Sequence, residues 1–471
     1  MSEIATKETK GFYKLSWAQR IGFGSGDLAQ NLIYQTVCTY LLIFYTSVFG
    51  IPSAQAAVMF LIVRLVDVLW DPFVGAWVDS HSPKLGKYRS YLILGGIPLT
   101  GFAILCFWNT EFTHGSLMFA YITYVCLSLC YTLVNVPYGA LNASLTRDND
   151  EITTLTSTRM FMANIGGLIV QAGIPLIVKK MSPDGSMASA ASADAWFTTM
   201  TIFALAGLAL LIFCFTQTKE RVVMESSQTD KVKWSDLFTE FVRNKPLRIL
   251  ALFFITAFAM MSVSNAAGPY YMEYNLAGAP DVFGIPATSI FQGLGTIPAF
   301  IFLPLVPMIK RKIGKKGMFF VFLSIAIVGM AILFTVSSIS ALRNHMWLVY
   351  LAQFIKASGV ITATGYMWAL VPEVISYGEY TSGRRISGIV NALTGIFFKA
   401  GMALGGVIPG FVLAAVKFDI DPNSIQAQQG ILWILCIIPA IMLGLAMFII
   451  SKYNLDDESL DKMNREIEAR S

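Results

Sequence analysis

Two aspartates, Asp67 and Asp71, lie four residues apart inside an apolar stretch that covers residues 54–79. Positions i and i+4 are neighbours on one helix face, so the two carboxylates project together. Two adjacent carboxylates cannot both be ionised cheaply in a low dielectric, so one keeps a proton or a bound monovalent cation offsets part of the charge. The pair therefore indicates a site for a proton or a sodium ion. Arg64 supplies the alternative, a static ion pair that only holds the helix.

A third acid, Asp27, follows three closely spaced glycines, Gly22, Gly24 and Gly26. Such small residues let a membrane helix approach its neighbours closely. Carboxylates accept hydrogen bonds from vicinal hydroxyls, so we predict that Asp27 faces a cavity and binds substrate. An ordinary acid at a helix end is the alternative.

Tyr131, Thr132 and Asn135 form a polar stripe in the residues that precede Pro137. A proline inside a membrane helix frees a backbone carbonyl, and such groups are tolerated where water, polar side chains or a ligand re-satisfy them. The stripe therefore indicates a substrate-facing surface. The alternative is a proline kink with ordinary helix-to-helix hydrogen bonds.

Three cations, Arg159, Lys356 and Lys399, also fall within apolar segments or at their ends. Each needs a partner, which could be one of the acids above or a carboxylate on a substrate. Lys356 has no acid near it in sequence, which favours the second role, whereas a lysine that extends to the membrane surface is the alternative for any of the three. Sugar rings stack on aromatic side chains, and Trp368 is a better candidate for this role than Trp70.

The elements that must position these residues are membrane-spanning helices. The chain has 471 residues, of which 55% are hydrophobic and 13% charged, whereas soluble proteins carry roughly a quarter charged residues. Apolar windows of about 20 residues, enough to cross the hydrocarbon of a bilayer, recur along the whole sequence. The twelve predicted spans are residues 17–48, 54–79, 90–110, 116–145, 155–179, 195–217, 247–276, 285–309, 317–339, 345–372, 387–415 and 428–451.

A polar central stretch separates six spans from six. The predicted organisation is an N-terminal six-helix bundle at 1–217, a cytoplasmic loop at 218–246, a C-terminal six-helix bundle at 247–451 and a cytoplasmic tail at 452–471. Loops rich in Lys and Arg alternate with loops that hold few, which by the positive-inside rule places both termini in the cytoplasm. A multi-pass membrane protein surrounded by lipid is expected.

Each half has a short basic turn after its second span, at residues 79–89 and 310–317. A duplicated transporter fold would put these turns at equivalent positions, with a substrate site at the midplane between the halves. We assign Asp79, Gly86, Lys87 and Arg89 to a conformational gate on the cytoplasmic side. The alternative is that any tight cytoplasmic turn is rich in Gly and Lys.

Composition also argues against other classes of function. The net charge of +5 comes from the basic loops and gives no reason to expect a nucleic-acid partner. No metal site or other cofactor is expected, because the six cysteines lie in apolar segments and the three histidines lie at or near segment ends. No zinc or Ser/His constellation suggests catalysis, and two acids on one helix turn are poorly placed to flank a substrate, so we expect no catalytic residues and no enzyme.

The sequence resembles the glycoside-pentoside-hexuronide:cation symporters, a branch of the major facilitator superfamily that includes melibiose carriers. The resemblance covers nearly the whole chain and implies the major facilitator fold. The motifs that carry it are Gly26-Asp27, Asp67-x-x-x-Asp71-Pro72, Gly86-Lys87-Tyr88-Arg89, Asn135-Val136-Pro137-Tyr138, Tyr377-Gly378-Glu379-Tyr380 and Lys399.

This resemblance implies that Asp67 and Asp71, with Thr132, occupy the cation site, and that Lys399 lies near it. It also implies that Asp27, Asn135 and Arg159 recognise the sugar, and we add Tyr131, Lys356 and Trp368 to the candidate substrate-binding residues.

The chain departs from melibiose-type carriers at three positions. Asn135 stands where they have a second sugar-binding aspartate, Trp70 where an asparagine assists sodium coordination, and Gly139 where an aromatic residue stacks on the sugar. The run around Asn135 looks more like the glucuronide- and xyloside-type members. An amide at this position suits an anionic uronide, which a second aspartate would repel.

We therefore predict an all-α membrane protein that couples uptake of a pentoside or hexuronide to inward flow of a proton or sodium ion. A cation-coupled carrier of another amphipathic solute, such as a lysolipid, is the nearest alternative. An intramembrane enzyme that uses Asp67 and Asp71 as an acid pair is the alternative from another class.

Overall fold

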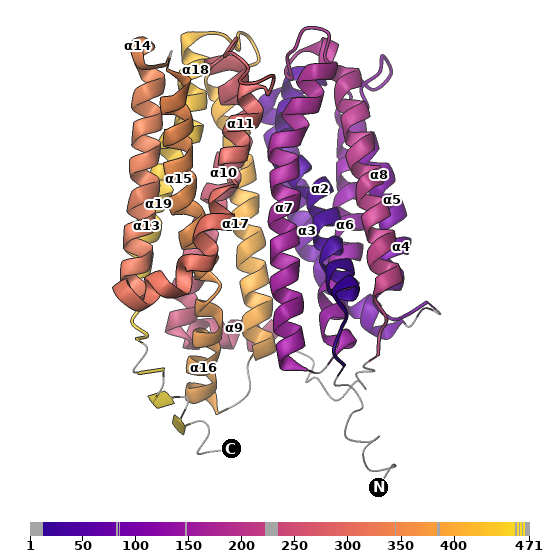
Figure 1. Ribbon diagram of the computed structural model, residues 1–471, viewed down its shortest axis with the longest axis vertical. Coiled ribbons are helices and arrows are strands. Elements are labelled where there is room, and N and C mark those ends of the chain that lie inside the picture. Colours follow the sequence, from indigo (N-terminus) through magenta and orange to yellow (C-terminus); the bar gives the residue numbers. More distant parts are fainter. Residues whose placement is uncertain are drawn as a thin grey trace. The chain divides into compact units, whose positions relative to one another are not determined.

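The computed structural model is built from helices joined by short connections (Figure 1). The residues that it describes are 13–81, 83, 85–146, 148–221, 234–343, 345–383, 387–456, 459, 460, 462, 463, 465 and 466. The chain divides into two compact units, Met1–Ser227 with Asp281–Ser289, and Gln228–Pro280 with Ile290–Ser471.

Seven α-helices and two short helical segments lie in the described part of Met1–Ser227. They are α2 (Trp17–Ile43), η1 (Phe44–Val48), α3 (Ser53–Ser80), α4 (Ser90–Leu94), α5 (Gly96–Cys106), α6 (Leu117–Leu145), α7 (Asn149–Met181), η2 (Ala190–Ser192) and α8 (Ala193–Gln217).

The later part of the chain is helical in the same way. Its described elements are α9 (Trp234–Arg243), α10 (Lys245–Tyr270), η3 (Tyr271–Asn275), α11 (Ala287–Leu294), α12 (Pro298–Phe302), η4 (Leu303–Leu305), α13 (Val306–Ser338), α14 (Ser340–Arg343), α15 (Met346–Met367), α16 (Leu370–Ser382), α17 (Ser387–Ala415), α18 (Ile425–Leu432), η5 (Trp433–Ile437) and α19 (Ile438–Ser451).

The predicted all-α class is confirmed. Eight helices in the described residues are long and apolar enough to cross a membrane, and Ser90–Cys106 is a shorter apolar helix. One of the eight, Ala287–Ser338, covers two predicted spans, because the basic turn between them is part of α13. That turn is marked by Gly314, where the backbone leaves the helix at φ 71°. The number of twelve crossings stays a prediction.

The two units pack their helices in the same order. In the first, α2 contacts α7 and α8, α3 contacts α6, and α5 contacts α6 and α8. In the second, α10 contacts α17 and α19, α12 contacts α15, and α13 contacts α15 and α19. The two sets correspond pair by pair along the chain, which is the pattern that internal duplication produces. This agreement supports the predicted repeat more strongly than the similarity of the two basic turns.

Glycines hold some of these helices close together. A Cβ at Gly359 of α15 would lie 2.4 Å from the backbone N of Ala326 and 2.4 Å from the carbonyl O of Phe322, both in α13. A Cβ at Gly329 of α13 would lie 2.4 Å from the backbone N of Lys356. Small residues at such crossings are typical of membrane helices, where close backbone packing replaces the hydrophobic effect. The crossing therefore fixes the backbone of α15 at Lys356.

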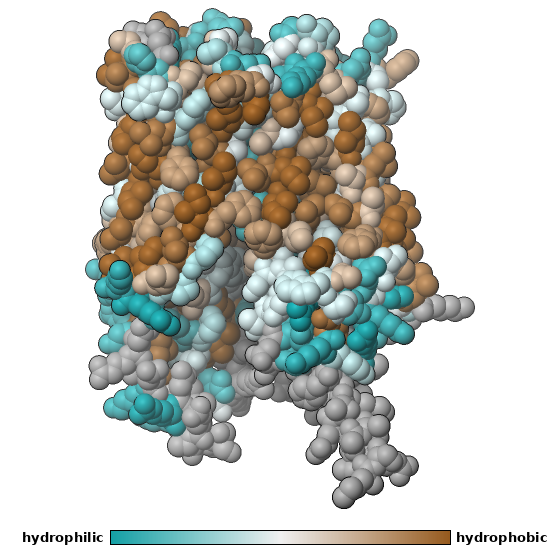
Figure 2. All heavy atoms as spheres, viewed as in Figure 1, coloured by the Kyte–Doolittle hydropathy of each residue, from teal (hydrophilic) through white to brown (hydrophobic). Residues whose placement is uncertain are grey.

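Figure 2 shows apolar side chains over the middle of each unit, with hydrophilic residues toward its ends. On α3, the side chains of Leu65, Leu69, Phe73 and Trp77 are each more than half exposed. Exposed apolar residues spaced about one turn apart form a face that requires a non-aqueous surrounding. This pattern agrees with a lipid-facing surface.

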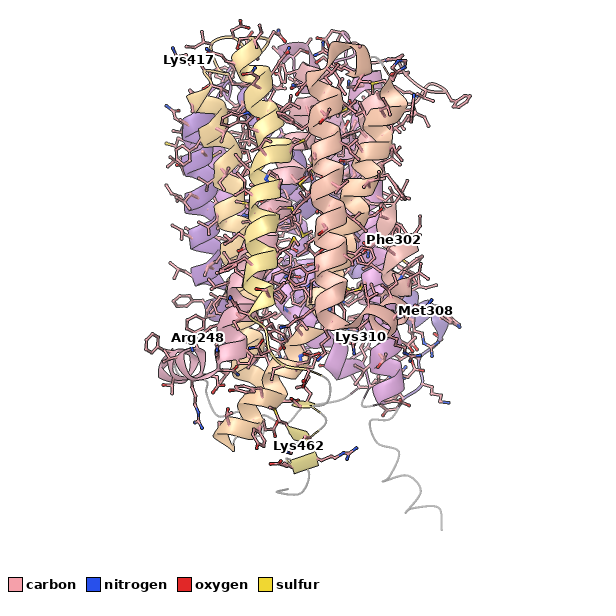
Figure 3. The ribbon with its side chains drawn as sticks, turned by 90° about the vertical axis from the view of Figure 1, so that its left-hand side faces the viewer. Arg248, Phe302, Met308, Lys310, Lys417 and Lys462 are labelled. Atoms are coloured by element: carbon pink, nitrogen blue, oxygen red, sulfur yellow. The ribbon has the colours of Figure 1, made fainter. Side chains whose placement is uncertain are left out.

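Charged residues gather at the ends of the second unit (Figure 3). Arg248, Lys310 and Lys462 lie toward one end, and Lys417 lies at the other. This distribution agrees with the sorting of basic residues by loop in the sequence, in which Lys417 belongs to a loop otherwise poor in Lys and Arg.

Candidate cation and substrate sites

Asp67 and Asp71 share one hydrogen-bond partner in the first unit. The Thr132 hydroxyl on α6 lies 2.9 Å from Asp67 Oδ1 and 3.2 Å from Asp71 Oδ1, both on α3. Asp67 and Thr132 are buried, at 3% and 1% exposure, whereas Asp71 is half-buried. The i, i+4 spacing thus places both carboxylates on the face of α3 that packs against α6, as the sequence predicts.

The shared hydroxyl has a chemical consequence. A threonine hydroxyl carries a single hydrogen, so it can fully serve only one of the two carboxylates at a time. A proton bound to one of the two carboxylates, or a cation held between their oxygens, would relieve the repulsion between the two carboxylates. Three oxygens arranged in this way suit a proton or a small hard cation.

Arg64 lies near Asp67 and forms its shorter contacts with α2. Its Nη1 is 3.9 Å from Asp67 Oδ2, at the outer limit of an ion pair, and only 2.9 Å from the Tyr34 hydroxyl, to which it donates. Its Nη2 is 3.3 Å from the Cys38 sulfur. Arg64 therefore satisfies its donors mainly on α2, although the pair with Asp67 that the static alternative requires is also present.

A small cavity adjoins Arg64 and is lined in part by Tyr34, Ser128 and Tyr131. The rings of Tyr34 and Tyr131 stack with their centroids 4.4 Å apart. Tyr131 thus meets α2 near Arg64, one residue before the hydroxyl that the two acids share. The stack holds α2 and α6 together beside the acid pair.

Asp27 on α2 pairs with Arg159 on α7. Arg159 Nε donates to Asp27 Oδ2, and Nη2 lies 3.4 Å from Oδ1. The two side chains are 13% and 22% exposed, so the pair is only partly sealed from solvent. This is one of the two roles expected for the intramembrane cations, neutralisation of an acid. No hydrogen bond from Arg159 Nη1 to another described residue is found, which leaves it available to a ligand.

Tyr138 on α6 packs against this pair. Its hydroxyl donates to the carbonyl O of Phe23 at 2.6 Å, and its ring lies 4.8 Å from the Arg159 guanidinium carbon. A Cβ at Gly26 would lie 2.4 Å from the Tyr138 ring, so only glycine leaves room for it. The glycine before Asp27 therefore shapes the site directly.

Asn135 lies on α6, three residues after Thr132 and four after Tyr131, so the three predicted polar residues do share one stripe. Asn135 is half-buried, and its amide makes no hydrogen bond to any residue in the described part of the chain. Its polar groups are thus free for water or a ligand.

The remaining candidates belong to the second unit. Lys356 on α15 is buried, and its Nζ donates to Ser264 Oγ of α10 at 3.2 Å. Trp368, where α15 ends, packs edge-to-face on Phe254 with centroids 5.0 Å apart and remains 46% exposed. Lys399 is half-buried on α17. Because Lys399 and the acid pair are in different units, its place near the cation stays a prediction.

The predicted cytoplasmic gate is held by a residue that sequence reasoning missed, Glu220. Its carboxylate accepts from the backbone N–H groups of Lys87, Tyr88 and Arg89 at 3.0, 2.8 and 2.8 Å. Arg89 Nη1 in turn donates to the carbonyl O of Thr218 at 2.7 Å, at the end of α8.

Gly86 starts this turn with φ 123°, a conformation that suits glycine. Asp79 is the last residue but one of α3, and its side chain lies outside the described residues. Glu220 stands in a polar loop among other charges, and nothing in the local sequence distinguishes it from a solvated acid. Tyr34 was missed for a related reason, since an aromatic residue in a chain rich in Phe and Tyr resembles ordinary packing.

In the described residues no group of three or more His, Cys, Asp or Glu side chains could hold a metal ion.

Comparison with known proteins agrees with these features. Residues 22–457 match the family described as MFS/sugar transport protein. The chain is 45% identical to "Uncharacterized symporter YnaJ" of Bacillus subtilis (strain 168), covering 97% of this chain and 96% of that protein. It is 32% identical to "Glucuronide carrier protein homolog" of Escherichia coli (strain K12), over 97% and 96% of the two chains. It is also 28% identical to "Isoprimeverose transporter" of Lactiplantibacillus pentosus, over 93% and 89%.

Solved structures share the fold. A D-xylose-proton symporter covers 94% of this chain and 98% of its own length, with a TM-score of 0.65 at 15% identity. The nucleoside transporter NupG gives a TM-score of 0.62 at 15% identity, over 93% of this chain and 100% of its own. At such low identity these likenesses concern the fold alone.

Proposed function

This chain belongs to the MFS/sugar transport protein family, and from that membership we propose that it is a secondary transporter that carries a sugar or glycoside into the cell together with a proton or sodium ion. Its relatives and structural neighbours are transporters, so the chain is a multi-pass membrane transporter and not an enzyme. No cofactor is required, because the energy comes from the gradient of the co-transported cation.

The proposed substrate is a pentoside, such as a xyloside, or a hexuronide. The printed names of two relatives, a glucuronide carrier homologue and an isoprimeverose transporter, support this range. Asp27 and Arg159 would receive the sugar hydroxyls, because a partly exposed ion pair offers both acceptors and a spare donor. Asn135 and Tyr131 would add contacts from α6, and Trp368 is proposed to stack on a sugar ring.

The proposed cation site consists of Asp67, Asp71 and Thr132, with Lys399 near it. The observation that carries this proposal is the single hydroxyl within 3.2 Å of both carboxylates. A bound cation would favour the sugar-binding conformation if that conformation has the higher affinity for it, which is the thermodynamic requirement for coupling. The cytoplasmic gate would include Asp79, Lys87 and Arg89. Glu220 and Gly86 hold the turn that carries Lys87 and Arg89.

We further propose twelve crossings of the bacterial cytoplasmic membrane, with both termini in the cytoplasm. Two six-helix bundles, at 1–217 and 247–451, would be joined by the loop at 218–246, and a tail would follow at 452–471. The basic loops support this orientation by the positive-inside rule. The matching packing order of the two units supports the two bundles.

The test is uptake into proteoliposomes under an imposed proton or sodium gradient, with xylosides, galactosides and glucuronides as solutes. Asp71→Asn keeps the size of the side chain and removes its charge. We expect this variant to lose accumulation against a concentration gradient while it retains some exchange of the solute across the membrane.

Asp456→Asn is the matched control, because this aspartate lies in the tail and is fully exposed. It should accumulate solute like the unmodified protein. Full gradient-driven uptake by Asp71→Asn would refute the coupling role of the acid pair. Absence of glycoside uptake by the unmodified protein under either gradient would refute the proposed function as a whole.

A further inference from the structure

Lys356 is buried in the second unit with little to offset its charge. Lys356 is only 5% exposed, and its Nζ donates to one partner, the neutral Ser264 hydroxyl at 3.2 Å. The ring of Phe291 lies 6.0 Å from the same nitrogen. Among the described residues, no carboxylate pairs with it. An ammonium group has three donors, so two of them are left for another partner.

Two glutamines of the same region also hold polar atoms that lack partners. Gln353 precedes Lys356 by one turn on α15 and is 4% exposed, and its Oε1 accepts no hydrogen bond. Gln292 on α11 is 5% exposed, and its Nε2 makes no hydrogen bond. In either orientation of its amide, each glutamine keeps a polar atom that can bind a further partner.

Glycines draw these side chains into one polar cluster. The Gln292 amide lies against Gly268 of α10, where a Cβ would come within 2.6 Å of Oε1. Gly268 is one turn after Ser264, the partner of Lys356, on the same face of α10. A Cβ at Gly295 would lie 3.1 Å from Gln353 Nε2. Lys356 therefore contacts α10 at Ser264, one turn before the glycine that Gln292 approaches, and Gln353 lies one turn before Lys356 on α15.

Such a cluster is a poor way to build a helix interface. A buried ammonium and buried amide groups are costly unless they are paired, and an apolar side chain of similar volume would serve packing better. A ligand that pairs with the ammonium and amide groups would offset this free-energy cost. That ligand must carry a negative charge and several acceptor oxygens for the ammonium and amide donors, and a hydroxyl donor for the remaining amide oxygen.

We propose that Lys356, Gln292 and Gln353 form a subsite for the carboxylate of an acidic sugar, so that the transported solute is a hexuronide rather than a neutral pentoside. This inference rests on the proposed transport function and selects one of its two substrate classes. A neutral pentoside would leave the Lys356 charge without compensation, whereas a uronate carboxylate pairs with it. Lys356 is then a specificity-determining residue and takes no part in cation coupling.

A glucuronide and a xyloside make a matched pair of solutes, because the xyloside has the same ring and hydroxyls but no carboxylate. We would measure kcat/KM for gradient-driven uptake of methyl glucuronide and methyl xyloside in proteoliposomes. The unmodified protein should prefer the glucuronide. Lys356→Met should lower kcat/KM for the glucuronide by about 10- to 100-fold, the usual effect of losing a charge-assisted hydrogen bond. Its uptake of the xyloside should not fall.

Lys462→Met, which changes an exposed lysine of the tail, is the control and should leave both rates unchanged. Gln353→Leu and Lys356→Arg supply readouts if Lys356→Met does not fold, as judged by size-exclusion chromatography. The first should reduce the preference for the glucuronide several-fold, and the second should retain it. The proposal is overturned if the unmodified protein prefers the xyloside, or if folded Lys356→Met loses both solutes equally. Absence of any glycoside uptake would instead count against the proposed function.

Discussion

The hydroxyl of Thr132 offers a way to identify the coupling cation, because its removal should act in opposite directions on a proton and on a sodium ion. In the structure the hydroxyl lies within 3.2 Å of both carboxylates of the acid pair. As a donor it stabilises the ionised carboxylates, and as an oxygen it is a ligand for a metal cation. Thr132→Val keeps the shape of the side chain and removes both abilities.

The size of each effect follows from the energy of a hydrogen bond to a charged group, about 1.5 to 3 kcal/mol. If the cation is a proton, the variant binds it more readily, because the ionised state has lost its donor. At 1.36 kcal/mol per pH unit, the pH midpoint of uptake should rise by about 1 to 2 units. If the cation is sodium, loss of one ligand should weaken its apparent affinity by about 10- to 100-fold.

The assay is initial uptake in proteoliposomes, recorded against external pH without sodium and against sodium concentration at fixed pH. Thr132→Ser retains the hydroxyl and should behave like the unmodified protein. Thr123→Val is the matched control on the same helix, because this buried hydroxyl donates to the carbonyl O of Phe119 at 2.8 Å and touches neither acid. If Thr132→Val alters neither curve, the shared hydroxyl is not part of the cation site and the reasoning fails.

Three further predictions concern the surroundings of the two sites. Gly26→Ala should lower the free energy of unfolding by about 1 to 3 kcal/mol and weaken substrate affinity, because a Cβ at this position would lie 2.4 Å from the Tyr138 ring. Thermal unfolding and uptake are the measurements, and Gly101→Ala is the control, because a Cβ at Gly101 has no neighbour within 4 Å. Glu220→Gln should speed hydrogen exchange of the amides of Lys87, Tyr88 and Arg89 by about 10- to 100-fold, and unchanged exchange would show that the carboxylate does not hold this turn. The Ser182 hydroxyl donates to Asp184 and keeps the pKa of that carboxyl below its usual value. The hydrogen bonds of the ionised Asp184 therefore contribute to stability above the usual pKa, and this contribution is lost as pH falls through the lowered pKa. Hydrogen exchange at the Ser186 amide, which donates to Asp184 at 3.0 Å, should accelerate beyond its intrinsic rate only below about pH 4.

Hydrophobic patterning predicted most of the helical spans because length and polarity are properties of a local stretch of chain. The first predicted span, 17–48, has the bounds of α2 and η1, where Ser16 and Gln19 form a capping box at the start. The third was predicted to end at residue 110, whereas α5 ends at Cys106. The chain stays apolar through Phe107 and Trp108 after the helix has ended, so composition alone does not mark that boundary.

In the candidate sites too, the sequence predicted the local arrangement of residues on one helix but not most of their distant partners. The spacing of Asp67 and Asp71 is enough to put both acids on one helix face. Their partner Thr132 is about sixty residues further along the chain, and only the resemblance to known symporters pointed to it. The partner of Asp27 is 132 residues away, so the sequence indicated that Arg159 needs an acid without indicating which one.

The sequence by itself determined that the chain forms long apolar helices, that two of its acids sit together, and that several charges must be buried among them. Those conclusions depend on helical periodicity and on the cost of charge in an apolar medium, which act locally. Only the tertiary structure decided which charge meets which partner: Asp27 meets Arg159, and Lys356 meets a serine instead of an acid. The reason is that a buried group is satisfied by whichever helix faces it, and packing between distant segments selects that helix.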